Sequence, residues 1–194
     1  MSRLLIMLAA AIVFAAFIDS RDRKFVRIWD GRRETKVTLL LGITLSLFCG
    51  MRVWGNDTVT YLQMYEQLPL IHQWKTEDIP PLAEGVGFSL LSSLIKTLGF
   101  SGQDYLLFFA VITVIPYVLF VHRFSESMKM GVFLMFATGM YTFTLAAIKQ
   151  CVATGICLMA LPAALDGRWR RFLGLILLAM LFHPYSVVYL AVPF

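Results

Sequence analysis

The chain has 194 residues, of which 59% are hydrophobic and 15% are charged, with a net charge of +5 and a mean hydropathy of +0.75. A soluble domain of this size cannot bury so many apolar side chains, which excludes a water-soluble enzyme. The basic residues gather between apolar runs rather than along an aromatic surface, so nucleic acid is not expected as a partner. The apolar runs have about the length of a membrane-crossing helix. We therefore expect an all-α, polytopic transmembrane helix bundle.

About six membrane spans are predicted, all within one transmembrane domain that covers residues 1–194. The first apolar run follows a single arginine and precedes a strongly basic segment, which places the N-terminus outside and the segment in the cytoplasm. We interpret this run as a retained anchor, because a signal peptide would carry its positive charge in front and small residues at a cleavage site behind. The predicted spans lie near residues 4–18, 37–53, 105–121, 127–140, 142–165 and 172–192, with an extracytoplasmic loop at 54–104.

Two shorter helices are expected in the loop after the second span. Residues 58–70 could form an amphipathic helix at the membrane interface. Residues 85–98 are apolar but short for a crossing, which predicts a re-entrant or interfacial helix. If this segment crossed, basic residues would be divided almost evenly between the two sides, whereas a non-crossing helix leaves a clear excess inside. The non-crossing topology is favoured, and it brings the polar residues of 52–84, Lys149 and the end of the last span to one side.

Lys149 and Gln150 interrupt an otherwise apolar run. A turn at 139–141 would place Lys149 about ten residues into a helix. An unpaired lysine at that depth costs on the order of 2.5 to 3.5 kcal/mol on insertion scales, so it should have a partner, a water-filled cavity or an anionic ligand. If the turn lay at Lys149 itself, the side chain would instead snorkel to the headgroups.

Two further polar side chains stand out from their apolar surroundings. His183 lies about eleven residues after Phe172, where an imidazole is either a satisfied packing residue or the mark of a functional site. Pro184 deprives an earlier carbonyl of its donor, which predicts a kink or a cavity beside the histidine. Arg52 ends the second span, either as an interfacial residue or as a planar fork for a diphosphate. The histidines and cysteines are too scattered to predict a metal site, and no cofactor is expected.

Four short stretches together resemble the EpsG family of exopolysaccharide proteins, relatives of the O-antigen (Wzy-type) polymerases. They are R-V-W-G-N-D-T at 52–58 with Tyr61, E-G-V-G-F at 84–88, I-K-Q-C-V-A at 148–153 and F-H-P-Y-S at 182–186. Lys149 stands where the family usually has arginine, which keeps the charge but loses bidentate recognition. The chain ends inside a predicted helix, so we expect it to correspond to the N-terminal half of a typical member, and such a truncated member could be inactive alone.

The resemblance implies a membrane glycosyltransferase of the polymerase type. It would extend a polyprenyl-diphosphate-linked glycan, for exopolysaccharide or O-antigen, at the outer side of the bacterial cytoplasmic (inner) membrane. The expected partners are the lipid-linked oligosaccharide, membrane lipids and other exopolysaccharide assembly proteins. A transporter or flippase of a lipid-linked or amphiphilic substrate and a non-catalytic assembly subunit are the alternatives.

Roles for individual residues follow from that implied chemistry. A diphosphate leaving group needs cations to absorb its charge, and the sugar hydroxyl that attacks needs a general base. The candidate cations are Arg52 and Lys149, and the candidate bases are His183 and Asp57. The groups expected to orient or stack on sugars are Glu84, Gln150, Trp54, Tyr61, Tyr65 and Trp74.

Overall fold

The computed structural model describes residues 2–22, 34–53, 57–75 and 79–192, and this part of the chain contains helices and no strand. The predicted all-α bundle is thereby confirmed. The elements are α1 (Ser2–Asp22), α2 (Glu34–Gly50), α3 (Thr58–Gln67), η1 (Ile71–Gln73), η3 (Leu82–Glu84), α4 (Val86–Thr97), α5 (Gly102–Phe124), α6 (Met128–Ala137), α7 (Met140–Phe143), α8 (Ile148–Leu165), α9 (Trp169–Phe182) and η4 (Pro184–Ala191).

Three helices of the described chain are long and apolar enough to cross a membrane, namely Arg3–Ser20, Gly102–Phe124 and Ile148–Leu165. Shorter apolar helices occupy Lys36–Gly50, Val86–Thr97 and Met128–Ala137. The 12 residues of α4 extend over only about 18 Å, well short of a hydrocarbon core of roughly 30 Å. This length fits the predicted re-entrant or interfacial helix.

The predicted spans at 127–140 and 142–165 differ in their boundaries from the helices observed. α6 has 10 residues and stops at Ala137, because Gly139 adopts a left-handed conformation with φ of 79°. A second break then separates α7 from α8. At this break the Thr144 hydroxyl donates a 2.6 Å hydrogen bond to the Tyr141 carbonyl and lies 3.4 Å from the Cys49 sulfur.

The predicted span at 172–192 is also not one continuous helix. α9 ends at Phe182, His183 has extended backbone angles, and η4 begins at Pro184. The proline supplies no backbone N–H and its fixed φ suits the first position of a new helical segment, so the break falls at this point.

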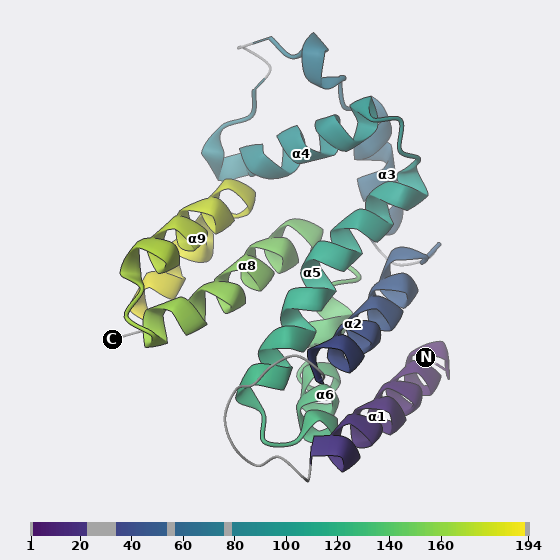
Figure 1. Cartoon of the computed structure of the whole chain (residues 1–194). Helices are drawn as coiled ribbons and strands as arrows, with labels where there is room; N and C mark the ends of the chain where they lie inside the picture. The colour runs from purple at the N-terminus through teal and green to yellow at the C-terminus, as the bar shows by residue number, and fades with distance from the viewer. Residues whose placement is uncertain (1, 23–33, 54–56, 76–78, 193–194) are drawn as a thin grey trace.

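α5 lies at the centre of the bundle (Figure 1). α2 packs along α5, and α8 packs against another side of α5. α9 packs against α8, and α1 packs against α6. The buried apolar residues form two clusters, one shared by α1, α2, α5, α6, α7 and α8 and the other by α3, α4, α5, α8 and α9. α4 lies across the ends of the neighbouring helices and contacts α3, α5 and α9 (Figure 1).

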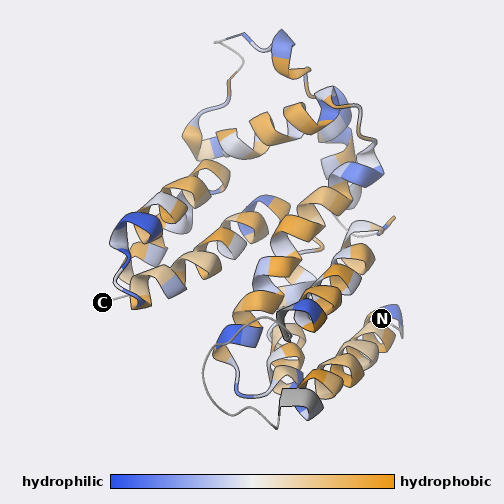
Figure 2. Cartoon of the chain, in the orientation of Figure 1, coloured by the Kyte–Doolittle hydropathy of each residue, from blue (hydrophilic) through white to orange (hydrophobic). Residues whose placement is uncertain are grey.

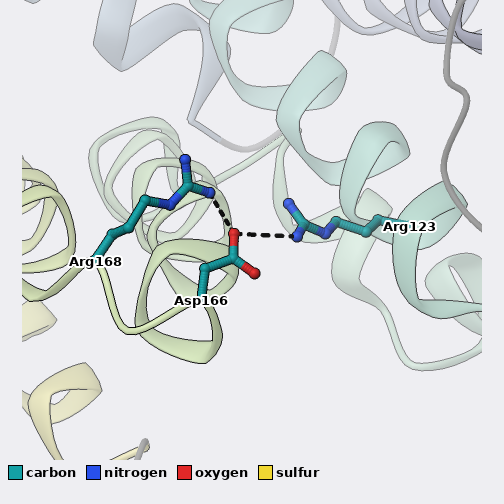
Figure 3. Close-up of polar contacts among 3 residues, drawn as sticks. All are labelled: Arg123, Asp166 and Arg168. Carbon is teal, nitrogen blue, oxygen red and sulfur yellow. Dashed lines mark hydrogen bonds and ion pairs between the residues drawn. The ribbon is translucent and has the colours of Figure 1, made fainter.

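Polar contacts at one end of the bundle link α1 to α6 and link α5 to the connection between α8 and α9. The Asp19 carboxylate of α1 accepts hydrogen bonds from the backbone N–H of Met128, at 2.7 Å, and from the Ser127 hydroxyl, at 2.9 Å. Asp166, after α8, lies between Arg168 and Arg123 (Figure 3). Arg123 belongs to the end of α5, and its Nη2 atom is 3.8 Å from Oδ2 of Asp166. Hydrophilic residues are concentrated at helix ends and in connections, whereas the helix middles are apolar (Figure 2).

The opposite end of the bundle carries α3 and α4. α2 and α9 end there and α8 begins there (Figure 1). The other terminus of each of these helices lies at the end that carries Asp19 and Asp166. This arrangement agrees with the topology in which residues 85–98 do not cross, since all the predicted site residues then lie at one end.

Candidate functional site

A cavity of about 470 Å³ opens at the end of the bundle that carries α3 and α4. Its walls come from the start of α3, from η3, from the start of α8 and from the end of α9. It is lined by most of the predicted site residues, but not by Arg52, Tyr65 or Trp74. The lining residues are Asp57, Tyr61, Ala83, Glu84, Ala147, Lys149, Gln150, Phe182 and His183.

Lys149 is the second residue of α8 rather than the tenth residue of a longer helix, so the predicted depth within a helix is wrong. The chain breaks immediately before it, as in the alternative of a helix-end lysine. The ammonium nitrogen donates a 3.0 Å hydrogen bond to the Glu84 carbonyl and lies 5.3 Å from the centre of the Phe88 ring. Lys149 therefore links α8 to η3 and α4 at the wall of the cavity.

The start of α8 adds a partial positive charge to the ammonium of Lys149. The first hydrogen bond of this helix runs from the Cys151 N–H to the Ala147 carbonyl at 3.0 Å, and the N-cap residue Ala147 provides no side-chain cap. The N–H groups of the first turn thus have no partner within the helix. Because helix dipoles are positive at this end, the cavity wall formed by Ala147, Lys149 and Gln150 favours an anion.

Tyr61 of α3 stands beside this helix start. Burial raises the pKa of its phenol, although hydrogen bonding with the backbone of Lys149 and Ile148 acts in the opposite direction. The phenol is therefore protonated at neutral pH and presents both an O–H group and an aromatic face to the cavity.

His183 reaches the cavity because α9 stops there. Its backbone N–H donates to the Ala179 carbonyl at 3.0 Å, and its backbone then turns to extended angles with φ of −153°. Its ring is half-buried and lies 5.4 Å from the ring of Tyr185. The helix breaks at the histidine and a cavity lies beside it, in agreement with the predicted kink or cavity, whereas the predicted location of His183 inside a continuous helix is wrong.

Two glycines allow α4 to approach the end of α9. A Cβ on Gly85, whose φ is +81°, would lie 2.6 Å from the Phe182 carbonyl oxygen. A Cβ on Gly87 would lie 2.8 Å from the Cβ of Leu181. This close contact brings Glu84, the residue before Gly85, to the same cavity as Lys149 and His183.

Arg52 does not line the cavity, although it lies next to it in the interior. Its side chain is 4% exposed, with Nε donating to the Thr58 hydroxyl at 3.0 Å and Nη1 donating to the Cys49 carbonyl at 2.8 Å. Nη2 is buried and has no hydrogen-bond partner in the described chain. The predicted contact of Arg52 with a diphosphate therefore has no direct counterpart in the cavity lining.

The other aromatic residues predicted to stack on sugars hold the scaffold together. The Tyr65 ring stacks on Tyr105 at 4.3 Å, and its hydroxyl donates to the Phe100 carbonyl at 2.8 Å. Trp74 donates from Nε1 to the Ser93 hydroxyl at 2.8 Å, which fixes the chain after η1 to α4. Trp54 lies outside the described residues.

Sequence reasoning did not identify three apolar residues that line the cavity, Ala83, Ala147 and Phe182. Ala83 directly precedes Glu84, and Phe182 directly precedes His183. Ala147 lies two positions before Lys149. Their small or flat side chains carry no chemical signal, so only the spatial arrangement shows their contribution.

Comparison with known proteins identifies the family. The EpsG family model matches residues 36–194, a range that contains all the residues lining the cavity. No curated protein and no solved structure matches the chain. Because the match covers most of the sequence, the chain belongs to the EpsG family and is a membrane protein of exopolysaccharide biosynthesis.

Proposed function

We propose that this protein is a polymerase-like glycosyltransferase that extends a glycan carried on a polyprenyl diphosphate. One observation carries the proposal: a single cavity joins an ammonium group, a helix start, two carboxylates and an imidazole from four separate parts of the chain. Extension of such a glycan needs both an anion-stabilising group and a proton acceptor, and this cavity offers both.

The diphosphate would bind at the start of α8. The Lys149 ammonium and the positive end of the α8 helix dipole can stabilise the negative charge that develops on the leaving diphosphate oxygen. Lysine acts here as a compact point charge rather than as a planar fork. The lipid tail of the donor would remain in the bilayer, since the protein is itself embedded in it.

The acceptor sugar would be activated by His183 or Asp57. The acceptor hydroxyl oxygen attacks the anomeric carbon of the donor sugar, and the bond from that carbon to the diphosphate oxygen breaks with its electron pair on the diphosphate. The hydroxyl proton passes to the His183 imidazole or to the Asp57 carboxylate. Tyr61, Glu84 and Gln150 line the cavity and would bind sugar hydroxyls.

The cavity would face the outside of the bacterial cytoplasmic membrane, with the N-terminus on that same side. The positive-inside rule supports this orientation, because Arg123, Arg168, Arg170 and Arg171 all belong to the end of the bundle away from the cavity.

The direct test is to supply the purified protein, in liposomes, with polyprenyl-diphosphate-linked repeat units. Wild-type protein should produce a ladder of longer glycans, and Lys149→Ala should leave the substrate unextended. In cells that lack the wild-type protein, repeat units should accumulate on the outer face. Accumulation on the inner face would instead identify a flippase, and a ladder that forms only after other assembly proteins are added would identify a non-catalytic subunit.

A further inference from the structure

Arg52 connects the end of α2 with the start of α3. Nη1 donates to the Cys49 carbonyl, near the C-terminus of α2, where a cation also interacts favourably with the helix dipole. Nε donates to the hydroxyl of Thr58, the first residue of α3. Arg52 is 4% exposed and Thr58 is 1% exposed, so both hydrogen bonds are sheltered from water.

The burial of this guanidinium is poorly explained by stability alone. A buried charge needs hydrogen bonds on all its polar atoms to offset the loss of water, and Nη2 has none within the described chain. A position that leaves a donor unsatisfied calls for an explanation outside simple packing.

The first turn of α3 depends on what Arg52 holds. The Tyr61 N–H donates to the Asp57 carbonyl at 2.9 Å, so Asp57, Thr58 and Tyr61 form one rigid turn. Asp57 is the N-cap residue but its side chain makes no capping hydrogen bond, which leaves its carboxylate to the cavity. Any displacement of Thr58 therefore moves both Asp57 and Tyr61 along the cavity wall.

We propose that Arg52 is a positioning residue, which sets the location of Asp57 and Tyr61 at the cavity through its hydrogen bond to Thr58. This inference rests on the proposed glycosyl transfer, and it replaces direct binding of the diphosphate by Arg52. Lysine cannot substitute, because one ammonium lacks the planar fork that reaches the ends of two helices at once.

The test is a double-mutant cycle of Arg52→Lys and Thr58→Val, measured as rates of glycan extension. Each single variant should lower the turnover number about tenfold with KM for the lipid-linked donor changed less than about twofold, and the double variant should be no slower than Arg52→Lys alone. Thr58→Ser, which keeps the hydroxyl, should restore extension. Thr60→Val makes the same chemical change at an exposed position of α3 and serves as the matched control.

Direct contact of Arg52 with the substrate predicts a different result. Arg52→Lys would then raise the KM for the donor, and Thr58→Val would leave both the turnover number and this KM unchanged. That pattern would overturn the proposal.

A second measurement separates this inference from the proposed reaction. Hydrogen exchange of the Tyr61 amide reports the first turn of α3 without any substrate. Arg52→Lys and Thr58→Val should accelerate it to a similar extent, and Thr60→Val should not. If wild-type protein extends no glycan, the proposed reaction is refuted, but the exchange rate of the Tyr61 amide still shows whether Arg52 holds the first turn of α3. An unchanged exchange rate in both Arg52→Lys and Thr58→Val refutes that role of Arg52.

Discussion

His183 is held at the cavity by its backbone rather than by a hydrogen bond to its ring in the described chain. Its N–H completes the last turn of α9, and the proline that follows forces the chain to turn away. The imidazole is thereby half-buried at the edge of the site, where it can reach both protein groups and a ligand.

The first prediction concerns this imidazole. His183→Gln should lower the turnover number of glycan extension by a factor of about 100 to 10,000, the range typical of a lost general base. His72→Gln, at an exposed residue of η1, is the matched control and should leave extension unchanged. A small effect of His183→Gln together with a large effect of Asp57→Asn would assign proton transfer to Asp57.

A second prediction concerns the charge of Lys149. Lys149→Met should slow extension by a factor of about 100 or more, because the leaving diphosphate loses its only side-chain cation in the cavity lining of the described chain. Lys149→Arg should keep most of the activity because it keeps the charge. Lys129→Met removes an exposed ammonium of α6 and is the comparison. Equal rates for Lys149→Met and Lys129→Met would contradict the proposed role.

At the scale of elements, the contact between α4 and α9 determines whether the cavity exists. Glu84 reaches the site only because η3 ends in a left-handed glycine and the start of α4 rests against the end of α9. A larger residue at Gly85 or Gly87 would push these helices apart.

Substitution of Gly85 tests this contact. Gly85→Ala combines the left-handed strain of about 1 to 2 kcal/mol with a clash against the Phe182 carbonyl. Gly99→Ala carries similar strain, with φ of +83°, and no atom within 4 Å of the added Cβ. We expect Gly85→Ala to lower both Tm in detergent and glycan extension more than Gly99→Ala does. Identical effects of the two substitutions would show that the close approach of α4 and α9 is unimportant.

The sequence predicts the type of each main element and the grouping of the site residues better than it predicts where helices end. Hydrophobic runs indicate the helices, and the charge distribution predicts that 85–98 does not cross the membrane. The break at 144–147 carries no glycine or proline. It forms where the Thr144 hydroxyl bonds the Tyr141 carbonyl and meets Cys49 of α2, a contact between distant segments that no local pattern reveals.

The role of Arg52 shows the same limit for the site. Its residue type and its motif point to a phosphate, and both are compatible with a surface or a buried location. Only the packing of α2 against α5 and the short connection to α3 place it in the interior. By contrast, Asp57, Glu84, Lys149 and His183 follow or precede helix ends, and helix ends at one side of a bundle necessarily lie near each other.

For the molecule as a whole, the two ends of the bundle differ in chemistry. One carries the cavity, and the other carries the Asp166 ion pairs and the arginines that follow (Figure 3). The proposed orientation assigns the first to the outside of the cell and the second to the cytoplasm.

Cysteine labelling in intact cells tests that orientation. Glu66→Cys, on exposed α3, should react with a membrane-impermeant maleimide, and Arg170→Cys, on the exposed start of α9, should react only after the cells are opened. The native residues Cys49, Cys151 and Cys157 are buried, and unsubstituted protein gives the background. The reverse labelling pattern would place the cavity in the cytoplasm.

The location of Lys149 at the second residue of α8 has a consequence for biogenesis. A lysine in the middle of a span would oppose entry into the bilayer, whereas here the insertion machinery receives α8 as an almost uniformly apolar segment with its charge at the rim. The same holds for α9, which ends before its histidine. Each helix can thus lie in the lipid without an ionised group at its middle, and the cavity forms only when the inserted helices assemble.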